Sequence, residues 1–164
     1  MLLLPFLLLA APPALPTVDT PEVFIEALAS DNGVGTTGGG ALGARVAIGH
    51  LSVAGRCSVQ SGSFALFTPN GGVEEHGQRL SCFADAGPQF DIGPVTARIT
   101  LGAGAALEQV GAIAPLVVTA AGASAGLRIT HDLAIVADAR IESAMGLKGL
   151  GGGFVVGAGL AMRL

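Results

Sequence analysis

Few residues in this chain are of types that do chemistry, and they are widely spaced. The three histidines are His50, His76 and His131, and none of them lies in an HExxH motif. Two cysteines are too few for a four-cysteine zinc site, and no Cys/His cluster has the spacing of metal ligands. The residues therefore predict no metal site, no cofactor and no catalytic centre.

The one covalent feature that the sequence offers is a bond between Cys57 and Cys82. The two residues fall in neighbouring segments and, by a period of two, face the same side. If the chain turns at residues 69–70, they lie directly opposite and can form a disulfide. If the whole of Thr68–Gln78 is a loop, they are out of register and remain two thiols. The sequence leaves both alternatives open.

The composition restricts the class of protein. The chain of 164 residues is 51% hydrophobic and only 12% charged, with 26 glycines and neither Trp nor Tyr. A mean hydropathy of +0.67 excludes a disordered chain, which needs low hydrophobicity and high charge. The net charge of −4 argues against a nucleic-acid partner, since such proteins present a basic surface.

The first residues resemble a targeting segment. Residues 1–11 are entirely apolar, and three prolines follow at positions 12, 13 and 16. This pattern predicts a secretory signal peptide over residues 1–16 and one exported domain over residues 17–164. The apolar run is too short for a membrane-spanning helix, which needs about 20 residues.

Clusters of Gly, Asn, Asp and Pro divide the rest of the chain into eight apolar segments, and these clusters predict turns. The expected connections are Ser30–Gly40, Ala54–Gly55, Thr68–Gln78, Gly87–Pro94, Glu108–Ala114, Thr130–Asp132 and Ser143–Gly153. Each segment is close to the 9–11 residues with which a tilted strand crosses a bilayer.

Strict alternation marks the later segments as strands with one apolar face. From Val95 to Leu107, every second residue is Val, Ala, Ile or Leu, and the opposite face carries Thr96, Arg98 and Thr100. The segments Leu133–Glu142 and Phe154–Leu164 repeat this pattern. We therefore expect strands with one face toward lipid or a core and the other toward a polar space.

Charged residues lie on the face opposite the apolar stripe, which is typical of a barrel with lipid outside and a polar interior. Counting from the expected loops places Glu26 opposite Arg45 and Asp85 nearly opposite Arg98, so that charges in the lumen would be paired. The predicted polar lumen consists of Glu26, Arg45, Asp85, Arg98, Arg128, Asp138, Arg140, Glu142 and Arg163.

Two other architectures fit parts of the sequence. A soluble, secreted ligand-binding barrel would use the same alternation with the apolar face inward, although the single lysine and the many small apolar residues fit it poorly. The uncharged stretch Val110–Leu127 is long enough for a transmembrane helix, but Pro115 and the β-branched run at residues 117–119 oppose that interpretation.

With these segments in hand, the chain resembles the small eight-stranded outer-membrane β-barrels of the OmpA transmembrane-domain and OmpX type. Gly159, Met162 and Leu164 match the ending of the closing strand of such families, with Leu in place of the usual terminal Phe. Residues 126–142 resemble a barrel hairpin with a short turn.

The resemblance implies an all-β, eight-stranded antiparallel up-and-down transmembrane barrel in the bacterial outer membrane. It implies outer-membrane lipid and, through the C-terminal strand, the barrel-assembly machinery as partners, with both chain ends in the periplasm. Because eight strands enclose an interior filled by side chains, we expect no open solute channel. The expected role is structural or surface interaction.

Some barrels of this size are enzymes that modify lipid A with His, Ser and a carboxylate at the outer-leaflet end. His76, Glu142 and Ser143 could approach that end here, but they match no motif. A catalytic base must lie within hydrogen-bond reach of its nucleophile, so the position of these three residues decides this alternative. We expect no enzymatic activity.

Overall fold

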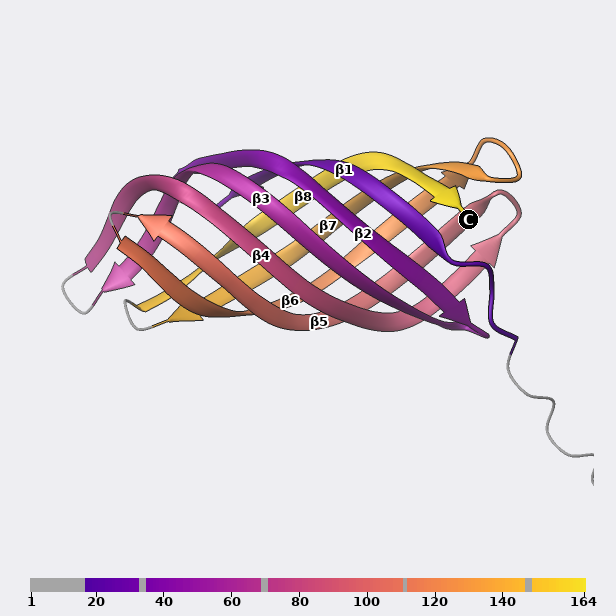
Figure 1. The fold of residues 1–164 in the computed structure, drawn as a ribbon, viewed down its shortest axis with the longest axis horizontal. Coiled ribbons are helices and arrows are strands. Elements are labelled where there is room, and N and C mark those ends of the chain that lie inside the picture. Colours follow the sequence, from indigo (N-terminus) through magenta and orange to yellow (C-terminus); the bar gives the residue numbers. More distant parts are fainter. Residues whose placement is uncertain (1–16, 33–34, 69–70, 111, 147–148) are drawn as a thin grey trace, which may run out of the picture.

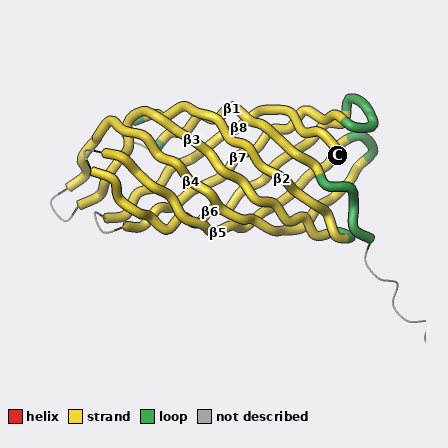
Figure 2. The backbone as a smooth tube through the Cα atoms, in the orientation of Figure 1, coloured by secondary structure: helices red, strands yellow, loops and turns green. Residues whose placement is uncertain are grey.

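The computed structural model describes residues 17–32, 35–68, 71–110, 112–146 and 149–164. Eight strands make up nearly all of this part of the chain (Figures 1 and 2). They are β1 (Glu22–Asp31), β2 (Thr36–Ile48), β3 (Leu51–Thr68), β4 (Gly71–Ile92), β5 (Val95–Val110), β6 (Ala112–Arg128), β7 (Leu133–Gly146) and β8 (Gly149–Arg163). The predicted signal peptide, residues 1–16, lies outside the described residues.

The strands close into one antiparallel barrel in sequence order. Each strand pairs with the next, and β8 pairs with β1 along a register that begins with Glu22 opposite Arg163. The even number of strands brings the start of β1 and the end of β8 to the same end of the barrel (Figure 1). The predicted fold class, an eight-stranded up-and-down barrel, is confirmed.

The alternation of the sequence becomes the two faces of the barrel wall. On β5, Ile99 and Leu101 are exposed on the outside, whereas Thr96 and Arg98 are buried inside. β7 and β8 follow the same rule, with Ile141 and Leu160 outside and Asp138 and Ala161 inside. The predicted outward faces of these late segments are confirmed.

The apolar outer stripe matches the thickness of a membrane. From Val95 to Leu107, at about 3.3 Å per residue and a tilt of about 40°, it is about 30 Å tall, the thickness of a bilayer's hydrocarbon core. On this face, β4 and β5 carry the opposed pair Gln78 and Gln109 just beyond the stripe. The apolar band therefore ends in polar residues at the end of the barrel away from the chain termini.

One predicted turn is wrong. The chain reverses at Gly49–His50 and not at Ala54–Gly55, which lie within β3 opposite Arg45 and Ala44. Gly49 has a φ of 62°, the left-handed conformation that glycine adopts without steric cost. The Gly55 that suggested a turn instead sits in the wall with open space around its α-carbon.

The connections at the end of the barrel away from the chain termini are shorter than predicted. β4 already begins at Gly71 and β5 continues to Val110, so most of Thr68–Gln78 and Glu108–Ala114 is strand. The same is true of Ser30–Gly40 and Ser143–Gly153. At the end near the termini, Gly87–Ile92 belongs to β4, so the predicted turn Gly87–Pro94 is reduced to Gly93–Pro94. Glycines mark crowded strand positions here: a Cβ on Gly39 would lie 1.9 Å from the Val59 carbonyl oxygen.

The helical alternative for Val110–Leu127 is also wrong. Val110 ends β5, and the stretch from Ala112 onward forms β6, which is paired along its length with β5. Within the described ranges, no helix is long and apolar enough to cross a membrane.

The barrel changes at the end away from the chain termini. At this end of the barrel, β1 finishes at Asp31 and β2 starts at Thr36. β3 extends farther and pairs with β8 through Phe67 and Leu150. The side-chain amide of Asn32 donates a hydrogen bond of 2.9 Å to the Ser63 carbonyl at this junction. The short β1–β2 hairpin is therefore bridged by its two neighbours.

Candidate functional site

The interior of the barrel holds most of its charge. Among the described residues, charged side chains from every strand except β6 converge there, and they form three groups stacked along the barrel axis. The inward carboxylates with described side chains are Glu22, Glu26, Asp85, Glu108, Asp138 and Glu142. The same number of arginines face this space, namely Arg45, Arg56, Arg79, Arg98, Arg140 and Arg163. The lumen is therefore close to neutral.

The group nearest the chain termini is centred on Glu22. Its Oε2 lies 2.6 Å from Arg45 Nε, and its Oε1 lies 3.5 Å from Arg163 Nε. Both arginines are its direct cross-strand neighbours, on β2 and β8. Arg98 Nη2 approaches Glu22 Oε2 at 3.8 Å, and its Nε donates to Gln89 Oε1 at 2.9 Å. One carboxylate thus joins β1, β2, β5 and β8.

The central group crosses the lumen. Arg56 Nη1 on β3 lies 3.0 Å from Glu26 Oε2 on β1 and 3.1 Å from Asp138 Oδ2 on β7. Asp138 also pairs with Arg140, whose Nε donates to Glu142 Oε1 at 2.6 Å. The two ion pairs of Arg56 connect β3 with β1 and β7, which are not its neighbours in the sheet at this level, so they brace the barrel across its interior.

The third group lies farther toward the opposite end. Arg79 on β4 and Glu108 on β5 face each other across the strand pair, and Arg79 Nε donates to Glu108 Oε2 at 2.9 Å. The Arg79 guanidinium also lies over the Phe64 ring, 4.7 Å from its centroid. A buried charge is tolerated here because it is paired and hydrogen-bonded.

Aromatic rings fill the space between the arginines. Arg56 lies 5.1 Å from the centroid of the Phe24 ring and 5.9 Å from that of Phe83. Gly43 makes room for Phe24: a Cβ at this position would lie 2.3 Å from the ring's Cζ atom. Cation–π contacts of this kind compensate part of the cost of desolvating a guanidinium.

Little free space remains among these groups. The central cavity, which Arg56, Asp85 and Arg140 help to line, has a volume of about 30 Å³. Two smaller interior cavities, one beside Glu22 and one beside Arg79, measure about 10 Å³ each. Volumes of this size accommodate at most about one or two water molecules each, far less than a solute path needs.

Of the predicted lumen residues, Glu26, Asp85, Arg98, Asp138, Arg140 and Glu142 are buried inside, and Arg45 and Arg163 lie at the lumen's end near the termini. Arg128 differs, because it is exposed at the mouth and forms no ion pair with another described residue.

The predicted pairings are wrong. Arg45 lies opposite Glu22 and not Glu26, and Arg98 lies opposite Gln89 and not Asp85. The centre of the β1–β2 pairing lies about two residues earlier in the sequence than assumed, and that of the β4–β5 pairing about two residues later. The cross-strand partner of each residue therefore changes by four positions.

Sequence reasoning missed Glu22, Arg56, Arg79 and Glu108 as members of the lumen. Three of them adjoin or lie in an expected turn: Arg56 follows Ala54–Gly55, Arg79 follows Thr68–Gln78, and Glu108 opens an expected loop. Glu22 stands at the start of the first segment. The signal was present, since Glu22 has the parity of Glu26 and Glu108 has the parity of Arg98. Continuing the period of two through the Gly-rich stretches would have found them.

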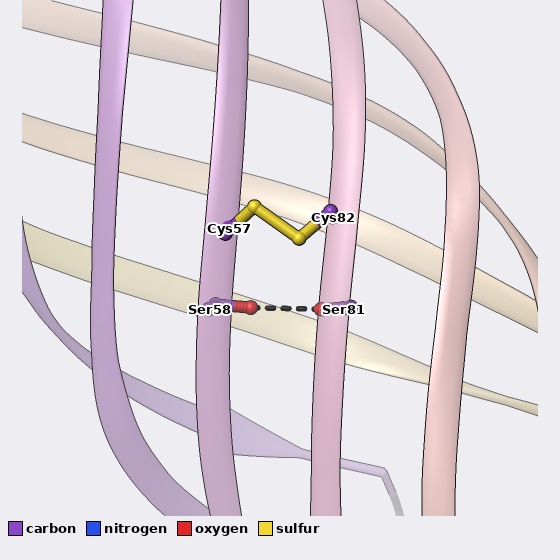
Figure 3. Close-up of a disulfide and its surroundings, with 4 residues drawn as sticks. All are labelled: Cys57, Ser58, Ser81 and Cys82. Carbon is purple, nitrogen blue, oxygen red and sulfur yellow. Dashed lines mark hydrogen bonds between the residues drawn. A yellow bond between two sulfur atoms is a disulfide. The ribbon is translucent and has the colours of Figure 1, made fainter.

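Cys57 and Cys82 form a disulfide, and both residues face outward (Figure 3). They are direct partners in the β3–β4 register, which extends to Thr68 opposite Gly71. On the next rung, Ser58 and Ser81 face inward and share a hydrogen bond of 2.8 Å (Figure 3). The open alternative of the sequence is thus resolved in favour of directly opposed cysteines.

The residues that could have formed an enzymatic centre are not brought together. Glu142 points into the lumen, where it pairs with Arg140, whereas its neighbour Ser143 is on the outer face. His76 is on β4 and contacts Ser63, with 3.2 Å between Nδ1 and Oγ. His50 lies in the β2–β3 turn and His131 beside Asp132 in the β6–β7 turn, both exposed. Among the described residues, no cluster of His, Cys, Asp or Glu could hold a metal ion.

Solved structures of similar architecture exist in several bacteria. The structure of Neisserial surface protein A matches with a TM-score of 0.65 at 14% identity, covering 90% of this chain and 99% of that one. The fold is that of the small eight-stranded outer-membrane barrels. A major outer membrane protein of Thermus thermophilus matches with a TM-score of 0.61 at 15% identity, over 89% and 100% of the two chains.

The N-terminal β-barrel domain of Pseudomonas aeruginosa OprF matches with a TM-score of 0.50 at 18% identity, over 87% and 97% of the chains. No family model matches the sequence, and no curated protein matches it significantly. The likeness therefore resides in the fold and not in a shared sequence motif.

Proposed function

We propose that this protein is an integral outer-membrane β-barrel with a structural or surface-interaction role and neither a catalytic centre nor an open solute channel. The observation that carries the proposal is the inverted distribution of polarity in the wall. Outward Ile99, Leu101 and Ile141 are each more than half exposed, whereas inward Arg98, Asp138 and Arg140 are each less than a tenth exposed.

A soluble barrel is disfavoured by the same distribution. In water, its outer face would present apolar side chains around the whole circumference, including Ile25, Leu42, Ile113 and Phe154. Monomeric soluble proteins rarely expose contiguous apolar patches larger than a few hundred Å². In lipid the same side chains are favourably placed, and the closed hydrogen-bonded wall leaves no sheet edge unpaired.

The proposed orientation follows the even strand number. Both chain ends and the turns at Gly49–His50, Gly93–Pro94 and residues 129–132 would face the periplasm, and the opposite hairpins would face the cell surface. β8 would be the strand offered to the barrel-assembly machinery, since it carries outward Leu160 and Met162 and closes the barrel against β1.

The surface role is the finer part of the proposal. The filled interior supports it, because cavities of about 30 Å³ and less leave no path for a solute. Most of the described lumen charges form ion pairs with one another, which supports an interaction role for the far hairpins. The name of Neisserial surface protein A, which shares the fold, describes that protein as a surface protein.

The test is heat-modifiability of the protein in the outer-membrane fraction of a Gram-negative host. An unboiled sample that migrates differently from a boiled one on a detergent gel supports a closed, detergent-resistant barrel. Recovery in the periplasm or the medium without a shift would refute the membrane assignment. Amino-terminal sequencing of the same band tests the signal peptide, for which we expect a start near residue 17.

A further inference from the structure

The disulfide lies on the outer face of the barrel, an unusual place for a bond whose formation requires aqueous thiol chemistry. Cys57 and Cys82 are both exposed on the outer face, and their neighbours on that face are all apolar. Along and across the strands these neighbours are Leu42, Gly55, Val59, Leu80, Ala84 and Ala105. If the barrel sits in a bilayer as proposed above, the sulfur atoms contact hydrocarbon.

The depth of the bond can be estimated from the strand geometry. β3 begins at Leu51, and at about 3.3 Å per residue and a tilt of about 40°, Cys57 lies about 15 Å above the turn. The first polar outward residue in the other direction, Ser61, is about 10 Å away by the same measure. The sulfurs therefore lie well inside the apolar band, away from water on both sides.

This position conflicts with the chemistry of thiol oxidation. The reactive species is the thiolate, which attacks a disulfide sulfur through a mixed-disulfide intermediate. A charged group inside the bilayer is costly, so neither a Cys thiolate nor an aqueous oxidant can function there. The lumen offers no second route, since both side chains point away from it and the β3–β4 wall separates them from it.

We propose that the bond is made before insertion, by a periplasmic thiol–disulfide oxidoreductase acting on a preformed β3–β4 hairpin. The Cys57 thiolate attacks the disulfide of the oxidoreductase and releases one enzyme thiolate. The Cys82 thiolate then attacks Cys57 Sγ and releases the second. Two electrons pass to the oxidoreductase, which ends as a dithiol, and the two cysteine protons go to solvent or to its thiolates. The inference rests on the proposed membrane location.

The hairpin is suited to forming first. Its register pairs Leu51–Thr68 with Gly71–Pro88 without interruption. Local contacts of this kind close a shorter loop than the contacts that seal the barrel, so they form at lower entropic cost. Ser58 and Ser81, on the neighbouring rung, hydrogen-bond in the same register.

The first test measures access to the bond in the finished barrel. The oxidised full chain is assembled into phosphatidylcholine vesicles and treated with the charged reductant tris(carboxyethyl)phosphine. Free thiols are then tagged with a mass-adding maleimide after denaturation. We expect reduction about 100-fold slower than for the same chain unfolded in urea, because the reductant's charge must enter the hydrocarbon.

A matched control moves the bond to the membrane edge. The variant C57A/C82A/I92C/V95C places two cysteines directly opposite each other beside the Gly93–Pro94 turn, also facing outward. Its bond should be reduced in vesicles nearly as fast as in urea. If the natural bond is reduced as fast as this control in barrels that float with the vesicles and shift on gels, this inference is wrong. Chains that neither float nor shift refute the proposed function and this inference with it.

The second test establishes the order of events in cells. After a short pulse of labelled amino acid, alkylated samples are separated with and without boiling. We expect molecules that already carry the disulfide but are not yet heat-resistant. Heat-resistant barrels that carry two free thiols and become oxidised later would overturn the proposal.

Discussion

The two faces of the barrel wall come from one alternating sequence but obey opposite rules. On the outer face of β5, the stripe from Val95 to Leu107 bears no charge. On the inner face, Arg98 and Glu108 of the same strand are buried with partners from other strands. On this strand, charged residues therefore occur only on the face where partners from other strands lie within reach.

Removing one partner from the interior should have the largest effect. Asp138→Ala removes the carboxylate that Arg56 and Arg140 share, while Glu26 and Glu142 remain as their other partners. Losing these two buried, charge-assisted hydrogen bonds costs about 3–5 kcal/mol in total. We expect the free energy of unfolding in lipid vesicles to fall by that amount, measured by urea titration with a gel-shift readout.

The control is Ser124→Ala, directly opposite Asp138 on β6 and without charge. It should change the free energy of unfolding by less than about 1 kcal/mol. If both variants unfold at the same urea concentration, the ion pairs do not brace the barrel.

Adding charge to the outer face should have the next largest effect. Leu101 is 69% exposed in the middle of the apolar stripe, and Leu101→Arg should destabilise the embedded barrel by about 2–4 kcal/mol. Gln109→Arg, on the same face beyond the end of the stripe, should cost about 1 kcal/mol or less. Vesicle flotation and urea titration of the two variants measure the difference, and equal losses would contradict a membrane boundary at this level.

Adding a methyl group at a crowded position in the wall should have a smaller effect on stability. A Cβ on inward Gly159 would lie 1.9 Å from the Ile25 carbonyl oxygen on β1. Gly159→Ala should therefore lower the free energy of unfolding by about 1–3 kcal/mol, because it overpacks the contact between β8 and β1. Gly55→Ala is the control, because nothing lies within 4 Å of a Cβ there. Urea titration of the control should show no loss of stability. A loss for Gly55→Ala that matches the loss for Gly159→Ala would refute the steric explanation.

The smallest effect is expected at the mouth of the lumen. Arg128 is exposed, so Arg128→Ala should change the free energy of unfolding by no more than about 0.5 kcal/mol. The same titration checks this, and a loss comparable with that of Asp138→Ala would place Arg128 in the ion-pair network.

The late strands were more predictable than the early ones. In β5, β7 and β8, apolar residues occupy every second position over the predicted segments, and the predicted outward faces are confirmed. In β2 and β3, glycines and serines weaken the alternation. Gly55 was consequently taken for a turn that lies at Gly49–His50. Glycine occurs both in turns and within strands, and only the pairing with the neighbouring strand distinguishes the two cases.

The sequence by itself determined the fold class and the orientation of side chains toward the two faces, because the period of two is a property of the extended backbone. The tertiary structure alone decided the ion-pair partners. Arg56 meets Glu26 and Asp138 only after β1, β3 and β7 are brought around one lumen. A shift of two residues in the centre of one hairpin changes every cross-strand partner but leaves each residue on its own face. The face of a residue could therefore be predicted from the sequence, whereas its cross-strand partner could not.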